Sequence, residues 1–384
     1  MRALQIVFFV TVMSLIMWGL HHYLWARLVR DPEWPLLWTR VGTIGIISAG
    51  VAIPLSMLLI RALPRAVGAP FAWAVFTWMG LSFFLFLGFA ATDGARAIMA
   101  AMAGAQDPER RRFMARLAAG VVGATGLITG LFAMRNALGP WTVRRVTVRL
   151  ANLPDALVGM RIVQLTDIHV GPTIGRDFIT SMVSKVNELR PDVIAITGDL
   201  VDGPVSELGA HVSPLAELRA KHGAFFVTGN HEYYSGVEAW AAELRRLGVR
   251  VLDNERVTVG VGDSVIDLAG VNDWSARRFE AFKPDLAKAL HGRDSTRPVV
   301  LLAHQPKVIK QAAEAGVSLV LSGHTHGGQI WPWTKLVALD QPYLAGLHRE
   351  GPTQIYVSEG TGYWGPPMRI GTSPEITEIT LERA

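Results

Sequence analysis

The sequence of 384 residues contains no cysteine. This absence excludes disulfide bonds, thiolate metal ligands and a cysteine nucleophile, and it leaves the redox compartment of the protein open. Lysine is also absent from residues 1–140, where the charge comes from twelve arginines and five acids. The net charge of +5 therefore belongs to the first part of the chain and not to a basic face on the second part. We accordingly expect no nucleic-acid partner.

Long apolar runs in residues 1–140 approach the roughly 20 residues that a helix needs to cross a bilayer. We expect about four transmembrane helices, over about residues 3–24, 41–60, 69–92 and 117–138. The first run has no small-residue cleavage site and is followed by the other three, so we interpret it as an anchor and not as a removed signal peptide. Residues 1–140 are therefore expected to form a membrane anchor.

Loop arginines favour one orientation of these spans. The loops after the first and third spans hold eight arginines, whereas the N-terminus and the loop after the second span hold three. Because arginine-rich loops stay in the cytoplasm, this excess predicts an extracytoplasmic C-terminal domain at the inner membrane of a bacterial cell. The excess falls to eight against seven if Arg135, Arg144, Arg145 and Arg149 also count.

Residues 141–384 have the composition of a soluble domain in which short apolar strands alternate with helical patterns. Residues 176–189, for example, place Ile179, Met182 and Val186 on one helical face. The alternation predicts an α/β domain. Five strands are expected within residues 161–169, 192–203, 223–232, 297–306 and 317–326.

Each of these five strands ends in Asp, Asn or His. In open α/β sheets, the carboxyl ends of the strands are where ligands bind. Taken alone, Asp199 or Asn230 would more simply be a turn former, and His304 a buried core histidine. Five such ends in series, all rich in the residue types that bind metals, favour a metal site instead.

The polar residues form five motifs in a fixed order. They are Asp167-x-His169, Gly198-Asp199-x-x-Asp202-Gly203, Gly229-Asn230-His231-Glu232, His304 and Gly323-His324-x-His326. This series resembles the signature of the calcineurin-like metallophosphoesterases over about residues 158–384. The stretches GHTHGGQI and GYWGPPMRIGTSPEIT resemble the membrane-associated bacterial phosphodiesterase branch. The resemblance implies an αββα fold, a two-sheet sandwich flanked by helices, after the transmembrane helices.

The resemblance also implies which residues bind two divalent metal ions. Asp199 would bridge the two ions. The other ligands would be Asp167, His169 and His326 for one ion, and Asn230, His304 and His324 for the other. Imidazole, carboxylate and amide ligands without thiolate suit Mn²⁺, Fe or Zn²⁺, of which we expect Mn²⁺.

Other residues are expected to support the chemistry. His231 matches the family position that gives a proton or hydrogen bond to the phosphoryl or leaving oxygen, work that suits a His pKa near neutrality. Asp202 and Glu232 fit positions behind the ligands, although solvation at the surface explains Glu232 equally well. Arg369 is expected either to neutralise the substrate phosphate or to form a structural ion pair.

The tryptophans Trp331 and Trp333 follow the last motif closely. Three interpretations are open for them: lining an apolar substrate groove, touching the membrane surface, or packing within the fold. Packing is the simplest of the three. The sequence does not decide among them.

Together these features predict a membrane-anchored phosphoesterase. The expected reaction is in-line attack of a metal-bridging hydroxide on a phosphomonoester, phosphodiester or pyrophosphate, without a covalent intermediate. The anchor favours a lipid or envelope-associated phosphoester as substrate. The alternatives are a UDP-diacylglucosamine-type pyrophosphatase, which commonly has Asn-Arg-Asp where this chain has Asn230-His231-Glu232, and a non-catalytic membrane sensor or scaffold.

Overall fold

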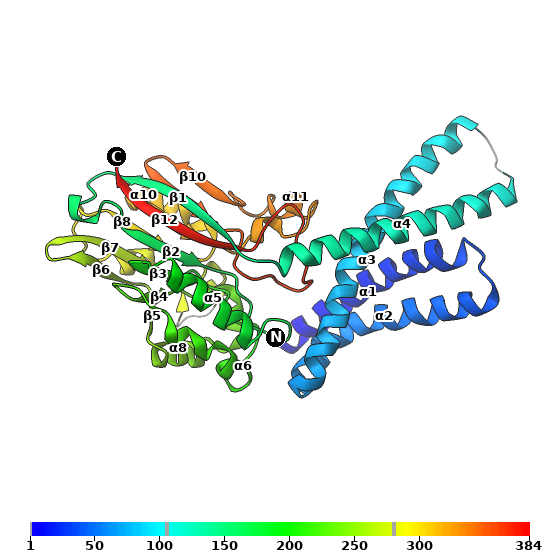
Figure 1. Cartoon of the computed structure of the whole chain (residues 1–384), viewed down its shortest axis with the longest axis horizontal. Coiled ribbons are helices and arrows are strands. Elements are labelled where there is room, and N and C mark those ends of the chain that lie inside the picture. Colours follow the sequence, from blue (N-terminus) through cyan, green and yellow to red (C-terminus); the bar gives the residue numbers. More distant parts are fainter. Residues whose placement is uncertain (1, 104–106, 279–281) are drawn as a thin grey trace. The chain divides into compact units, whose positions relative to one another are not determined.

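The computed structural model describes residues 2–103, 107–278 and 282–384. The chain divides into an all-helical unit and a mixed α/β unit (Figure 1). The helical unit comprises Met1–Arg135 and Gly365–Met368, and the α/β unit comprises Asn136–Trp364 and Arg369–Ala384.

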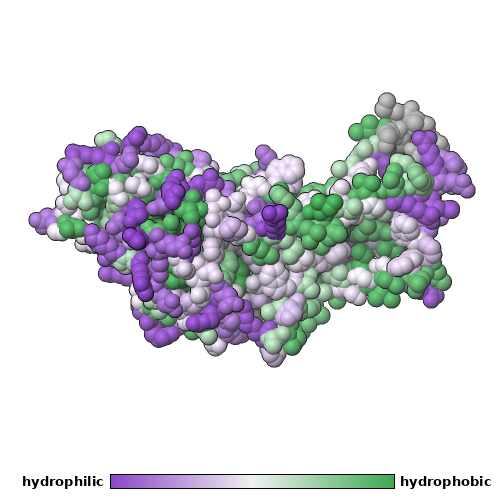
Figure 2. Space-filling view, viewed as in Figure 1, coloured by the Kyte–Doolittle hydropathy of each residue, from purple (hydrophilic) through white to green (hydrophobic). Residues whose placement is uncertain are grey.

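The helical unit contains α1 (Arg2–Trp25), α2 (Leu36–Ala62), α3 (Arg65–Ala103) and α4 (Pro108–Ala137). Three of these helices contain stretches long and apolar enough to cross a membrane, namely Leu36–Met57, Arg65–Ile98 and Pro108–Ala137. The first predicted span coincides with α1, but the side chains of residues 1–7 and 9 lie outside the described part. Three helices of membrane-spanning length are thus present, and the count of four transmembrane helices stays a prediction. Hydrophobic residues cover much of the length of these helices (Figure 2).

Two glycines let α4 approach α3 closely. A Cβ at Gly126 would lie 2.9 Å from Leu85 Cδ2, and a Cβ at Gly130 would collide with Leu81. Such a pair of small residues four positions apart is a common packing face between membrane helices.

The α/β unit is built on two six-stranded sheets, with strand orders β1-β12-β2-β3-β4-β5 and β10-β11-β9-β8-β7-β6. The first sheet contains β1 (Thr142–Leu150), β2 (Arg161–Leu165), β3 (Val193–Ile196), β4 (Ala224–Phe226), β5 (Val249–Val251) and β12 (Glu375–Arg383). The second contains β6 (Glu255–Val261), β7 (Ser264–Gly270), β8 (Val299–Leu302), β9 (Leu319–Ser322), β10 (Gly346–Glu350) and β11 (Thr353–Val357). Strands β2, β3 and β4 are parallel, as are β8 and β9.

Successive side chains of a strand point to opposite faces of its sheet, so each sheet contributes to a hydrophobic core on either face. In β2, Ile162 belongs to the core between the two sheets, while its neighbour Val163 belongs to the core between the first sheet and its helices. The helices on the first sheet are α5 (Arg176–Glu188), α6 (Val205–Val212) and α8 (Val237–Arg246), and those on the second are α9 (Leu286–Leu290) and α10 (Ile309–Glu314). The predicted two-sheet α/β fold is confirmed.

The short strands in the middle of both sheets are buried on both faces. Every residue of β3, β8 and β9 is buried, which explains their continuous apolar sequences. Helix α5 buries Ile179, Met182 and Val186 on the face that the sequence predicts. The carboxyl ends of β2, β3, β4, β8 and β9 are thereby fixed by three hydrophobic cores, and the predicted motifs follow these ends.

Leu268 of β7 lies in the core between the sheets and is 1% exposed. We expect Leu268→Ala to lower the free energy of unfolding by about 2–5 kcal/mol, because the truncation leaves a cavity. Urea unfolding of the full chain in detergent measures the change. Val261→Ala, at an exposed position in the same sheet, should change it by less than about 0.5 kcal/mol. Equal effects of the two substitutions would contradict the placement of the core.

Candidate metal centre

The loops that follow the central strands are joined to one another by backbone hydrogen bonds. The N–H of Asp167 donates to the carbonyl of Gly198 (3.0 Å), and the N–H of His169 donates to the carbonyl of Asp199 (3.1 Å). In the second sheet, the N–H of Gly323 donates to the carbonyl of His304 (2.9 Å). The motifs from separate strands are therefore held at fixed distances by the main chain as well as by the sheets.

Five of the predicted ligands have a left-handed backbone. Their φ angles lie between 50° and 72°, at Asp167, His169, Asp199, His324 and His326. Each such conformation costs a non-glycine residue about 1–3 kcal/mol and persists only where the surroundings impose it. The left-handed backbone ends the alternation of side chains between the two faces of the strand. Two ligands separated by one residue can therefore reach the same centre.

Two glycines permit the closest approaches between the loops. A Cβ at Gly229 would collide with Asp199 Oδ1, and a Cβ at Gly323 would collide with Asp167 Oδ2. Any larger residue at either position would push a predicted ligand out of place. The glycines that precede these motifs are therefore required by space.

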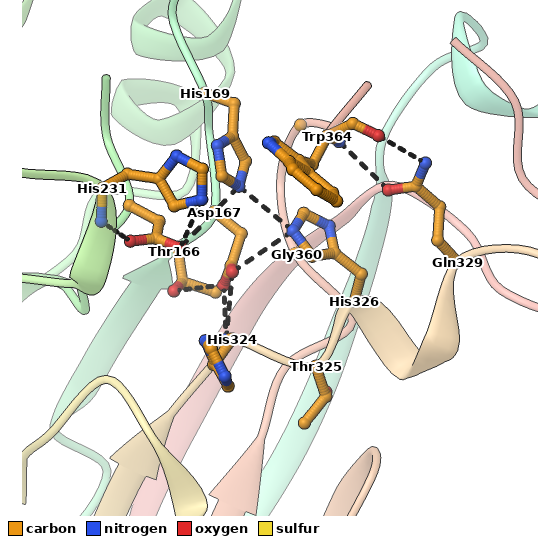
Figure 3. Close-up of polar contacts among 12 residues, drawn as sticks. Thr166, Asp167, His169, His231, His324, Thr325, His326, Gln329, Gly360 and Trp364 are labelled. Carbon is orange, nitrogen blue, oxygen red and sulfur yellow. Dashed lines mark hydrogen bonds and ion pairs between the residues drawn. The ribbon is translucent and has the colours of Figure 1, made fainter. Parts of the chain in front are cut away.

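The first group of ligand atoms comes from Asp167, His169 and His326 (Figure 3). The Nε2 atoms of the two histidines are 3.1 Å apart, and His326 Nε2 lies 3.4 Å from Asp167 Oδ1. The Nδ1 of His169 lies 3.0 Å from Asp202 Oδ1. All three ligand residues are buried.

The second group comes from Asp199, His304 and His324. His304 Nε2 lies 3.1 Å from Asp199 Oδ2 and 3.1 Å from His324 Nδ1. The Nδ1 of His304 is 2.8 Å from the carbonyl oxygen of Thr197, to which it donates. The donation fixes the tautomer, so that Nε2 of a neutral His304 presents a lone pair to this group.

Two observations fit metal ions at both groups. In each group two ring nitrogens face each other at 3.1 Å. The Nδ1 atoms of His169 and His304 donate to Asp202 and to the carbonyl of Thr197, which leaves a lone pair on each Nε2. Nitrogens that share one ion, at about 2.0–2.1 Å each, lie at most about 4.2 Å apart. In addition, Asn230 Oδ1 is buried without a hydrogen-bond partner. An orphaned amide oxygen in the residue next to His231 is the atom that a metal ligand would provide.

His231 stands beside the two groups and is held at both ends. Its backbone N–H donates to Asp199 Oδ1 (2.9 Å), and its Nδ1 lies 2.6 Å from Asp202 Oδ1. Burial alone would lower the pKa of His231, but the carboxylates of Asp199 and Asp202 raise it to about 9. Burial would raise the pKa of Asp202, but the imidazoles of His169 and His231 hold it well below its usual range. Asp202 thus orients one predicted ligand and the predicted proton donor together.

Glu232 is buried and connects two loops of the site. Its carboxylate accepts hydrogen bonds from the backbone N–H groups of Gly229 (2.6 Å), Leu200 (2.9 Å) and Asp199 (3.1 Å). Burial and the Asp199 carboxylate raise the pKa of Glu232 to about 7, although the N–H groups favour the charged form. The 1% exposure of Glu232 rules out solvation at the surface as the reason for this residue.

Arg369 is fully buried and bonds to the main chain. Its guanidinium donates to the carbonyls of Gly362 (2.7 Å), Glu359 (2.8 Å) and His326 (3.3 Å). Burial lowers the pKa of Arg369 to about 10. Among the ion pairs of the described residues, none involves Arg369. The placement favours a structural role that connects the C-terminal tail to the loop of His326, by main-chain contacts and not by an ion pair.

The rim of the site includes residues that the motifs do not identify. The rings of Trp364 and Tyr234 both lie edge-on to His231, with centroids at 5.9 and 5.6 Å. Gln329 fixes Trp364 by accepting from its N–H (3.0 Å) and donating to its carbonyl (2.9 Å), as Figure 3 shows. Thr166 donates to Asp167 Oδ2 (2.6 Å). Gln329 lies within the GHTHGGQI stretch, and that position is the only signal in the sequence for its role.

We expect Glu232→Ala to destabilise the fold by about 2–5 kcal/mol, because three buried N–H groups lose their acceptor. Glu238→Ala is the matched control, since Glu238 is an exposed glutamate in the neighbouring α8. The control should change the free energy of unfolding by less than about 0.5 kcal/mol. Urea unfolding of both variants measures the difference, and a similar small change in both would contradict the role of Glu232.

Comparison with known proteins identifies the family. The sequence profile of the calcineurin-like phosphoesterases matches residues 160–328. A transmembrane protein with metallophosphoesterase domain from Danio rerio is 43% identical over 266 residues, which cover 67% of this chain and 61% of the relative. An uncharacterized metallophosphoesterase from Helicobacter pylori is 46% identical over 224 residues, which cover 58% of this chain and 60% of the relative.

A shorter relative is covered almost completely. An uncharacterized metallophosphoesterase from Aquifex aeolicus is 35% identical over 245 residues, which cover 62% of this chain and 91% of the relative. The chain spans about three fifths of the length of the Danio and Helicobacter relatives. The profile match includes all five predicted motifs. The chain belongs to the calcineurin-like phosphoesterase family, as its motifs predict, and it has apolar helices of membrane-spanning length.

Proposed function

We propose that this chain hydrolyses a phosphoester at the membrane with two divalent metal ions. Asp199 is expected to bridge the ions. The other proposed ligands are Asp167, His169 and His326 for one ion, and Asn230, His304 and His324 for the other. We propose Mn²⁺ as the native metal, with Fe and Zn²⁺ as alternatives that the same donor set accepts.

The observation that carries this proposal is the position of the Asp199 carboxylate between two ligand groups. Its Oδ2 lies 3.1 Å from His304 Nε2 and 3.9 Å from His169 Nε2, which belong to different groups. One carboxylate within reach of both groups is the arrangement that a bridging ligand requires. Because the Asp199 side chain is buried, its negative charge needs compensation by cations in the folded protein.

Two bound ions would supply an activated water as nucleophile and would neutralise the charge of the phosphoryl group. His231 is the proposed proton donor to the leaving oxygen. Its Nδ1 bonds to Asp202, which leaves Nε2, 4.0 Å from Asp199 Oδ2, as the nitrogen that can face the substrate. Asp202 keeps that ring in place and stabilises its protonated form. The proton passes from His231 Nε2 to the leaving alcohol or phosphate.

The substrate that we propose is a lipid or envelope-associated phosphoester, either a diester, a monoester or a pyrophosphate. The support is the position of the hydrolase domain after apolar helices and the exposed aromatic rings of Trp364 and Tyr234 beside His231. His231 stands where a UDP-diacylglucosamine-type pyrophosphatase commonly has arginine, which disfavours that alternative.

We expect Asp199→Ala and His231→Ala to lower kcat through different steps. Asp199→Ala should reduce metal content and activity together, because it removes the shared ligand. His231→Ala should keep the metal and lower kcat by about 10²–10⁴-fold, because it removes the general acid. The measurements are elemental analysis and hydrolysis of soluble nitrophenyl esters, phospholipids and lipid pyrophosphates. His222→Ala, at a histidine that belongs to none of the five motifs, is the control. If the wild-type protein hydrolyses none of these phosphoesters and both variants behave as it does, the sensor or scaffold alternative is favoured.

Removal of the metal provides a second test of the proposal. Dialysis against a chelator should abolish hydrolysis, and Mn²⁺ should restore it to a greater extent than Zn²⁺. Elemental analysis of the protein as purified should give two ions per chain. Activity that survives complete removal of metal would contradict the mechanism, and restoration by Zn²⁺ alone would correct the choice of Mn²⁺.

We also propose that the hydrolase domain faces away from the cytoplasm at the bacterial inner membrane, on the basis of the loop arginines. The absence of cysteine makes this testable with a single-cysteine variant. A membrane-impermeant maleimide should label Val261→Cys, at an exposed position of the domain, in intact spheroplasts. Labelling that requires lysis of the spheroplasts would place the domain in the cytoplasm.

A further inference from the structure

Large apolar side chains are exposed in one short segment of the α/β unit. Among the described residues of this unit, most exposed hydrophobic side chains occur singly, as at Val158 and Val261. Four others lie within nine residues: Trp331 is 59% exposed, Trp333 53%, Leu336 52% and Leu339 84%. We call these four residues the Trp–Leu surface. Scattered apolar residues need no explanation, whereas a concentrated set commonly marks an interaction site.

The Trp–Leu surface does not contribute to the cores of the fold. It includes the single-turn helix α11 (Thr334–Val337, labelled in Figure 1), which has no buried residue. The hydrophobic cores of the unit contain none of its four members. More than half of each of these four side chains is exposed, so of the three interpretations of the tryptophans the structure disfavours packing within a core.

The segment is fixed to the rim of the site by its own main chain. The N–H of Trp331 donates to the carbonyl of Ile370 (3.0 Å). Two residues earlier, the side chain of Gln329 forms two hydrogen bonds with the backbone of Trp364, whose ring stands beside His231. The Trp–Leu surface consequently continues from the rim of the metal centre and starts five residues after the proposed ligand His326.

Charge and composition identify the partner as a lipid bilayer. Tryptophan and leucine next to a basic residue are typical of segments that enter the interface between lipid headgroups and acyl chains. Lys335 is exposed within α11, and Asp340 is paired with Lys307 (2.7 Å), so the segment presents a net positive charge. Residues 138–141 alone separate α4 from β1, so only a short linker connects the domain to a helix of membrane-spanning length.

We propose that the Trp–Leu surface inserts into the headgroup region of the membrane and holds the metal centre at the level of lipid phosphates. The insertion itself follows from the exposed apolar surface. Its catalytic consequence, a preference for phosphoesters presented by the bilayer, rests on the proposed hydrolase function. Trp364 and Tyr234 at the rim would then meet the part of the substrate nearest to the acyl chains.

The depth of a spin label at Leu339 tests the insertion without any reference to activity. The full chain has no cysteine, so Leu339→Cys and, as control, Val261→Cys each take one nitroxide. The labelled proteins are reconstituted into vesicles of phosphatidylcholine and phosphatidylglycerol. We expect the ratio of accessibility to oxygen over a water-soluble nickel complex to be at least about threefold higher at position 339 than at 261. Equal ratios, or a label at 339 shielded from both reagents by protein, would overturn the proposal.

A second measurement tests the catalytic consequence. In Leu336→Glu/Leu339→Glu, the rate on a phosphoester lipid in vesicles relative to the rate on soluble bis-nitrophenyl phosphate should fall about tenfold. Val261→Glu, the matched control, should keep the wild-type ratio. A label inserted in lipid in a chain without hydrolytic activity would leave the insertion standing and contradict the proposed function. An active chain whose label lies in water would do the opposite.

Discussion

The candidate metal centre depends on one constraint, namely that parallel strands of two packed sheets end at the same edge. The carboxyl ends of β2, β3 and β4 come from the first sheet, and those of β8 and β9 come from the second. The core between the sheets fixes the distance between the two sets of loops. Asp199 from the first sheet and His304 from the second consequently meet at 3.1 Å, although more than a hundred residues separate them in the chain.

The remaining features of the site hold buried charge and strained backbone in place. Left-handed conformations at five proposed ligands cost stability, and the hydrogen bonds of Glu232 to three N–H groups offset part of this cost. Asp202 holds two imidazoles in place through hydrogen bonds, those of His169 and His231. Arg369 joins the C-terminal tail to the loop of His326 through main-chain carbonyls. The strained backbone of the proposed ligands thus lowers the stability of the fold, and the hydrogen bonds of the surrounding groups offset part of this loss.

Much of this arrangement is predictable from the sequence because it follows from local patterns. The five motifs stand directly after apolar strands, so their meeting point follows from the rule for parallel strand ends. The roles of Arg369 and Gln329 were not predictable, since both depend on contacts across 35 to 43 residues. The exposure of Trp331 and Trp333 was not predictable either, because apolar residues in a loop follow no periodic pattern that would distinguish packed from exposed positions. The first predicted span stays a prediction, while helices of membrane-spanning length occur at the other three.

The central claim is that seven side chains from five loops hold two ions that share Asp199. Anomalous X-ray scattering from crystals of the full chain grown with Mn²⁺ tests it most directly. The account predicts two anomalous peaks roughly 3.5–4 Å apart. One peak should lie against Asp167, His169 and His326, and the other against Asn230, His304 and His324, with Asp199 in contact with both. A single peak, or two peaks that do not share Asp199, would contradict the account.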